Sequence, residues 1–73
     1  MIKYKHKETG LYLTKRKSAY VAVYKLTGKG TVWAHDCIKT MSLRKEGFVE
    51  GFFSPDEFEK ETYTLTFGKN ENN

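Results

Sequence analysis

Several features that constrain other folds are scarce or absent in this 73-residue sequence. It has one cysteine, Cys37, so no internal disulfide can form. The longest apolar run, Ala19 to Tyr24, has six residues, whereas a helix that crosses a bilayer needs roughly 20. The Lys-rich start carries no apolar signal segment. We therefore expect a protein of the reducing cytoplasm that does not enter a membrane.

The patterns of common catalytic and metal sites are also missing. The loop from Thr27 to Thr31 lacks the Gly-x-x-x-x-Gly-Lys-Ser/Thr spacing of a phosphate-binding loop. His35, Asp36 and Cys37 are the residue types of a nucleophilic site, but consecutive residues of an extended chain point in alternating directions. His6 could join His35 and Cys37 on a metal, although their spacing is not that of a zinc site. We predict no enzyme activity, no metal and no cofactor.

The length and the aromatic content are those of one small domain. The chain is too short for a second domain, and its eleven aromatic residues bury a large area per side chain. We expect a single β-rich domain over residues 1–68, followed by a disordered polar tail over residues 69–73.

Alternation of apolar and polar residues predicts β-strands along most of the chain. At the start, Ile2, Tyr4 and His6 alternate with lysines, which gives one buried and one solvated face. A turn at residues 8–10 leads into a hairpin partner, and glycines at 28 and 30 reverse the chain after the central strand. We expect strands at residues 2–7, 11–14, 20–26, 31–34, 38–43, 48–53 and 62–67, with 31–34 paired to 20–26.

These segments predict a mainly β fold, as a small curled antiparallel sheet or open barrel of five or six strands. The predicted core consists of Leu11, Leu13, Val21, Val23, Trp33, Phe48, Phe52, Leu65 and Phe67. So short a chain is expected to leave strand edges open, and pairing of these edges across a two-fold axis would give a homodimer.

One short helix is predicted over residues 55–61. Ser54 can cap the helix while Glu57 reaches back to it, and Pro55 occupies the first helical position, where its missing N–H has no cost. Phe53 and Phe58 would form a hydrophobic staple across this start. The nearby acids suit the positive end of a helix dipole, which explains them without any catalytic role.

Charge is distributed unevenly along the sequence, and this is the main functional signal. The net charge is +4, but residues 1–45 carry +9 and residues 46–73 carry −5. Basic and aromatic residues alternate in the first half, a pattern that suits phosphates and stacked bases. The predicted binding residues are Lys3, Lys5, Lys7, Tyr12, Lys15, Arg16, Lys17, Tyr20, Lys25 and Lys29.

Two alternatives stay open at this point. Tyr4 could belong to the core while the lysines beside it form an ordinary solvated face. A basic surface also suits a protein partner as well as it suits nucleic acid. Nucleic acid and a protein partner would each make this a binding protein, whereas a solvated lysine face carries no function.

Two short segments resemble a group of very small bacteriophage-encoded proteins. Residues 6–12 match their His-Lys-x-Thr-Gly-Leu-Tyr start, and residues 26–33 match a later Leu-Ser/Thr-x-Lys-Gly-x-Val-aromatic segment. The resemblance implies a phage protein that acts in the cytoplasm of a host bacterium. Proteins of this size in that setting bind and redirect host proteins or nucleic acid.

Overall fold

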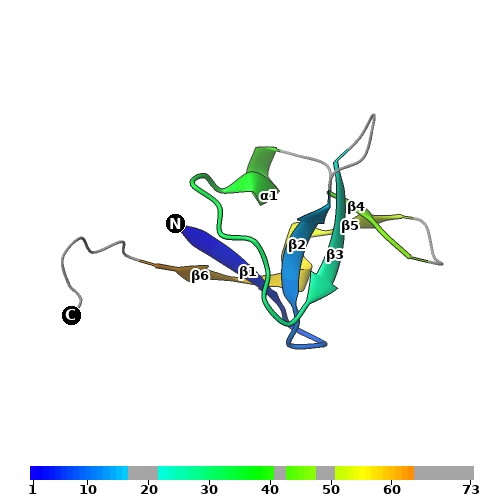
Figure 1. Cartoon of the computed structure of the whole chain (residues 1–73), viewed down its shortest axis with the longest axis horizontal. Coiled ribbons are helices and arrows are strands. Elements are labelled where there is room, and N and C mark those ends of the chain that lie inside the picture. The colour runs from blue at the N-terminus through cyan, green and yellow to red at the C-terminus, as the bar shows by residue number, and fades with distance from the viewer. Residues whose placement is uncertain (17–21, 41–42, 48–50, 64–73) are drawn as a thin grey trace.

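The computed structural model describes residues 1–16, 22–40, 43–47 and 51–63. These residues form one curled sheet of six strands in the order β5-β4-β3-β2-β1-β6 (Figure 1). The prediction of a mainly β fold with a small curled sheet is confirmed. The strands are β1 (Ile2–His6), β2 (Tyr12–Arg16), β3 (Val23–Thr27), β4 (Leu43–Lys45), β5 (Phe52–Phe53) and β6 (Phe58–Thr62), with a helical turn α1 (Cys37–Thr40) and a 3-10 turn (Pro55–Glu57).

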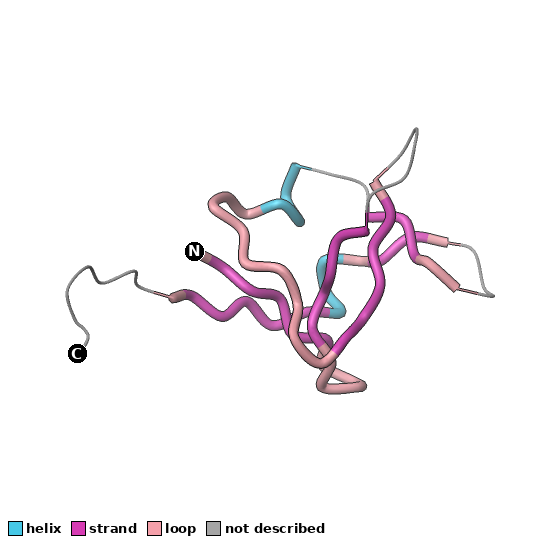
Figure 2. The backbone as a smooth tube through the Cα atoms, viewed as in Figure 1, coloured by secondary structure: helices cyan, strands magenta, loops and turns pink. Residues whose placement is uncertain are grey.

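The sheet is antiparallel except at one pair of neighbours. β3 and β4 run parallel, with Val23 opposite Arg44. Parallel neighbours require a crossover connection, and here the crossover is the segment after β3 that contains α1 (Figure 2). The chain therefore forms a mixed sheet, because the connection after β3, which ends in α1, runs back along the sheet before β4 begins.

The segment predicted as a strand at 31–34 does not pair with β3. It lies instead between β1 and β2, which pair with each other only near their hairpin. Thr31 donates its backbone N–H to the Leu13 carbonyl at 3.0 Å, and Trp33 and Ile2 exchange backbone hydrogen bonds of 2.8 and 2.9 Å. The left-handed Gly30, with φ 78°, turns the chain into this gap.

The predicted helix over 55–61 is only a 3-10 turn, because β6 begins at Phe58. Residues 58–62 pair with β1 along its whole length, His6 standing opposite Phe58 and Ile2 opposite Thr62. A full sheet ladder thus replaces a helix of two turns that would have been too short to stand alone. The predicted staple is nevertheless in contact, since the rings of Phe53 and Phe58 lie 5.3 Å apart.

The predicted strand at 38–43 is also replaced, by α1 and then β4. Cys37 and Ile38 are both buried, which a helical turn allows and an extended strand does not, since its consecutive side chains point apart. The predicted strands at 48–53 and 62–67 fall partly on residues 48–50 and 64–67, which lie outside the described residues, as does the predicted tail.

The core lies on the concave side of the sheet, where α1 covers it. Among the predicted core residues Leu13 is fully buried and Trp33 packs against the core. The prediction is wrong for Leu11 and Phe52, whose side chains are 39% and 64% exposed. Val23 is half-buried on the opposite face, and Val21, Phe48, Leu65 and Phe67 lie outside the described residues. The buried hydrophobic residues are Tyr4, Leu13, Tyr24, Cys37, Ile38, Leu43 and Phe58.

In the described part of the chain no helix is long and apolar enough to span a bilayer.

Candidate functional site

The two faces of the sheet differ in chemistry. Side chains alternate along each strand, so Tyr4, Leu13 and Tyr24 point to the buried concave side, which we call the inner face. Their neighbours point to the opposite side, where they are half-buried or exposed. This outer face carries the side chains of Lys3, Lys5, Tyr12, Thr14, Arg16, Val23, Lys25, Thr27, Arg44, Phe52, Glu59 and Glu61.

Five of the ten predicted binding residues share the outer face. Lys3 and Lys5 come from β1, Tyr12 and Arg16 from β2, and Lys25 from β3, which are adjacent strands. The buried position of Tyr4, with 3% exposed, confirms that the lysines of β1 form the solvated side of that strand. The fold therefore gathers cations that are spread over more than twenty positions of sequence.

The other predicted binding residues do not join this group. Lys7 and Lys29 are exposed in the turns that follow β1 and β3. Lys15 stands opposite Tyr24 in the sheet register and so belongs to the inner side. Lys17 and Tyr20 lie outside the described residues.

Sequence reasoning missed three other charged residues of the outer face, one cation and two acids. Arg44 was missed because the predicted strand ended at residue 43, whereas β4 runs from Leu43 to Lys45, with Leu43 buried and Arg44 half-buried. Glu59 and Glu61 were assigned to a helix, yet as strand residues they stand directly opposite Lys5 and Lys3. The sequence did hold a signal for this pairing, because acids alternate at residues 57, 59 and 61 as lysines alternate at residues 3, 5 and 7, and opposite charges favour cross-strand pairs.

The two ends of the outer face are neutralised to different extents. At one end Glu46 pairs with Arg16 at 3.2 Å and approaches Lys25 at 3.9 Å. At the other end, Lys3 and Lys5 have no ion pair within 4.0 Å of a described carboxylate. Their ammonium groups are thus the more available charges of the face.

Glu61 is the centre of an exposed polar network at that second end. Its Oε1 accepts hydrogen bonds from the hydroxyls of Tyr12, at 3.0 Å, and Tyr63, at 2.8 Å. The Lys3 Nζ lies 5.4 Å from the Tyr12 ring centre and 5.7 Å from that of Tyr63, within cation–π range. The hydrogen bond to Glu61 raises the pKa of Tyr63 to about 12 and also raises that of Tyr12.

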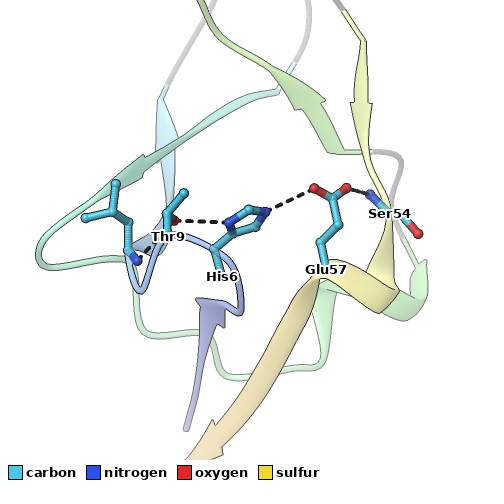
Figure 3. A network of polar contacts seen from close by, with 5 residues as sticks. His6, Thr9, Ser54 and Glu57 are labelled. Carbon is cyan, nitrogen blue, oxygen red and sulfur yellow. Dashed lines mark hydrogen bonds and ion pairs between the residues drawn. The ribbon is translucent and has the colours of Figure 1, made fainter.

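A second polar network lies on the inner side, around His6 (Figure 3). His6 is 6% exposed, and its Nδ1 and Nε2 lie 3.0 Å from Thr9 Oγ1 and from Glu57 Oε1. An ionised carboxylate only accepts hydrogen bonds, so Nε2 donates to Glu57, while Thr9 Oγ1 accepts the N–H of Leu11 and also contacts Nδ1. Both ring nitrogens are therefore engaged in holding the fold.

Glu57 connects this histidine to the start of β6. Its Oε2 accepts the backbone N–H of Ser54 at 2.7 Å, which is the Glu57 half of the predicted capping box (Figure 3). The hydrogen bonds from the Ser54 N–H and from His6 lower the pKa of Glu57. The partnership of His6 with a residue 51 positions away has no signal in the sequence.

An open pocket of about 410 Å³ lies beside His6 and Glu57. Its wall includes the Phe53 ring, and Lys45 Nζ lies 5.2 Å from the centre of that ring. Glutamates and lysines both line the pocket, so negative and positive charges are mixed there. This balance of charge favours no single class of ligand. The chemically distinctive surface of the described chain is therefore the outer face.

Metal-ligating residues do not gather in the described ranges, where no group of three or more His, Cys, Asp and Glu side chains could hold an ion. Cys37 is buried in the core, and burial raises the pKa of its thiol to about 11. A thiol in that state is a poor nucleophile at neutral pH.

Comparison of the chain with protein-family models, with curated proteins and with solved structures finds no significant match.

Proposed function

We propose that this protein binds single-stranded nucleic acid across the outer face of its sheet. The observation that carries the proposal is the gathering of Lys3, Lys5, Tyr12, Arg16 and Lys25 on three adjacent strands. Arg44 on the next strand extends the same face. Lysine and arginine side chains neutralise phosphates and release counterions, and exposed rings stack on bases.

The spacing of the cations supports an extended ligand. Lys3 and Lys5 are two residues apart on one strand, which places them about 7 Å apart, and adjacent strands lie about 4.8 Å apart. Cations at this spacing can follow a flexible backbone across the strands. Lys3 and Lys5 would contribute most to affinity, because Arg16 and Lys25 already share Glu46.

The proposal includes the cellular location in which the protein acts. The resemblance of residues 6–12 and 26–33 to small bacteriophage proteins favours action in the cytoplasm of a host bacterium. A nucleic-acid-binding protein in that setting would act on phage or host transcripts or on exposed DNA strands.

One observation favours a second candidate, a host-protein partner. Phe52 is 64% exposed and lies on the outer face beside Arg44. Exposed aromatic residues next to arginine are enriched at protein interfaces. In this alternative the protein is an inhibitor or modulator of a host protein. The terminal strands β5 and β6 could also pair with a second copy to give the expected homodimer.

Binding of labelled, unstructured oligonucleotides by fluorescence anisotropy, over a range of salt concentrations, tests the proposal. Two variants are compared with the natural chain: Lys3→Ala with Lys5→Ala on the outer face, and Lys15→Ala with Lys39→Ala away from it. Both remove two positive charges, and both control lysines are exposed. Thermal melts of each variant show that the fold is retained.

We expect weaker binding to every sequence for the outer-face variant and a smaller change for the control. The slope of log affinity against log salt should decrease by about 1.4, because each phosphate contact on a single strand contributes about 0.7. Equal losses in the two variants would contradict the proposed face. Absence of oligonucleotide binding, together with a nuclease-resistant protein captured in stoichiometric amount from bacterial lysate, would favour the protein partner instead.

A further inference from the structure

Two tyrosine hydroxyls reach Glu61 from different parts of the sheet. Tyr12 lies on β2 and Glu61 on β6, so the Tyr12 side chain reaches across β1 to donate its hydrogen bond at 3.0 Å. Tyr63 donates from the position after β6, at 2.8 Å to the same oxygen. Two hydroxyl donors therefore converge on a single anionic atom.

Positive charge surrounds the same point. Lys3 stands opposite Glu61 in the β1–β6 register, and its ammonium lies near both tyrosine rings. Hydrogen bonds from the two tyrosines, followed by the charges of Lys5 and Lys3, lower the pKa of Glu61. The carboxylate is thus charged at neutral pH and held mainly by hydroxyl donors.

We infer that Lys3, Lys5, Tyr12 and Tyr63 form an anion-binding site that the Glu61 carboxylate fills in the free protein and a phosphate group fills in the complex. This inference rests on the proposed function and names the part of the outer face where a phosphate binds. The four side chains supply two hydroxyl and two ammonium donors. Neither ammonium is held in an ion pair with a described carboxylate, so both remain available to an incoming anion.

The chemistry of the two anions explains why a phosphate can replace the carboxylate. Only one oxygen of Glu61 accepts both tyrosine hydroxyls. A terminal or inorganic phosphate presents three or more acceptor oxygens and can meet hydroxyls and ammonium groups at once. Glu61 is tethered to β6, so it competes with the ligand and lowers the apparent affinity of the site.

Glu59 provides the matched control for this competition. It lies two residues before Glu61 on the same strand and the same face, opposite Lys5. It is exposed and accepts no hydroxyl from the tyrosines that the structure describes. The variants Glu61→Gln and Glu59→Gln therefore remove the same charge from the same surface, and only Glu61→Gln removes the competing anion.

The experiment measures binding of inorganic phosphate, followed by tyrosine fluorescence, in the natural chain and in both variants. We expect Glu61→Gln to bind phosphate at least about fivefold more tightly than the natural chain, which is the lower end of typical coupling between competing groups. Glu59→Gln should change the affinity much less. Adding Tyr63→Phe to Glu61→Gln should reverse part of the gain, because one donor is lost while the charge is unchanged.

The outcomes separate this inference from the proposed function. Equal gains in Glu61→Gln and Glu59→Gln would show an effect of net charge alone and would overturn the anion site. Oligonucleotide binding by the natural chain would then still support the outer face. Conversely, tighter phosphate binding in Glu61→Gln without oligonucleotide binding by any variant would keep the anion site and reject nucleic acid as its ligand.

Discussion

Glu57 and Glu61 are four residues apart, yet the fold places them in opposite roles. Glu57 precedes β6 and turns inward, where it accepts hydrogen bonds from the buried His6 and from the Ser54 backbone. Glu61 lies within β6 on the outer face, where it accepts two tyrosine hydroxyls. The pKa of each carboxyl is lowered, in both cases mainly by hydrogen bonds.

The comparison teaches that a lowered pKa does not by itself mark a functional carboxylate. One of the two donors to Glu57 is the buried His6 side chain, whose Nε2 would lose its only described partner without Glu57, so this contact stabilises the fold. At Glu61 the donors are accessible to water, which can replace the carboxylate if it is removed. Burial of the partner, rather than the state of the carboxyl group, distinguishes the two contacts.

The largest difference is expected in stability. Glu57→Ala leaves the buried Nε2 of His6 without an acceptor, which costs about 1–3 kcal/mol. For a domain of this size each kcal/mol lowers Tm by about 4–8 °C. Urea unfolding and thermal melts should show this loss for Glu57→Ala, and a clearly smaller one for Glu61→Ala and Glu59→Ala. Equal losses in all three variants would refute the structural role of Glu57.

A double-mutant cycle measures how strongly His6 is coupled to Glu57 and to Glu61, and the expected energies are smaller. His6→Phe places an apolar ring among the rings of Phe53 and Phe58, so it removes the need for an acceptor. Combined with Glu57→Ala, it should show a coupling energy of about 0.5–3 kcal/mol, because the two residues share one contact. Combined with Glu61→Ala, it should be additive within about 0.5 kcal/mol. Coupling of similar size in both cycles would mean that the two networks are not independent.

Much of the outer face could be predicted from the sequence, because faces follow from local alternation. The period of two in the predicted strands at 2–7 and 11–14 places Lys3 and Lys5 on one face of the first strand, and Tyr12 on the face opposite to Leu11 and Leu13. Arg16 lies beyond the predicted strand, so its face could not be assigned in this way. The first turn was equally readable, since Gly10 adopts a left-handed φ of 74°. These features need only neighbours in the sequence.

The order of the strands and the partners of Glu57 and Glu61 could not be predicted. His6 meets a residue 51 positions away, and Tyr12 meets one 49 positions away. Such contacts depend on β6 pairing with β1, and the capping signals around Ser54 favoured a helix there instead. The capping signals correctly predicted a helical turn at residues 55–57. From Phe58 onwards, backbone pairing with β1 outweighs the helical propensity, and the segment forms a strand.

The smallest expected difference appears at high pH and separates the two carboxylates without any ligand. The pKa of Tyr63 is raised to about 12 in the folded chain, from an ordinary value of 10.0. Between these values the folded state binds more protons than the unfolded state, so stability falls as the pH rises from 10 towards 12. Below pH 10 the contribution is fully present. The acid side cannot separate the two residues, because the lowered pKa of each carboxyl gives stability that is lost as the pH falls.

Glu61→Gln removes the charge that raises the pKa of Tyr63, so this variant should lose less stability between pH 9 and pH 11 than the natural chain. Glu57→Gln should follow the natural chain in the same interval, because Glu57 contacts no tyrosine hydroxyl among the described residues. The quantity to compare is the difference between the unfolding free energies of each variant and of the natural chain at the same pH. Tyrosine absorbance should show the matching shift of a phenol towards pH 10 in Glu61→Gln alone. Parallel stability curves for all three proteins, with unchanged tyrosine titration, would show that Glu61 does not hold the two hydroxyls in solution.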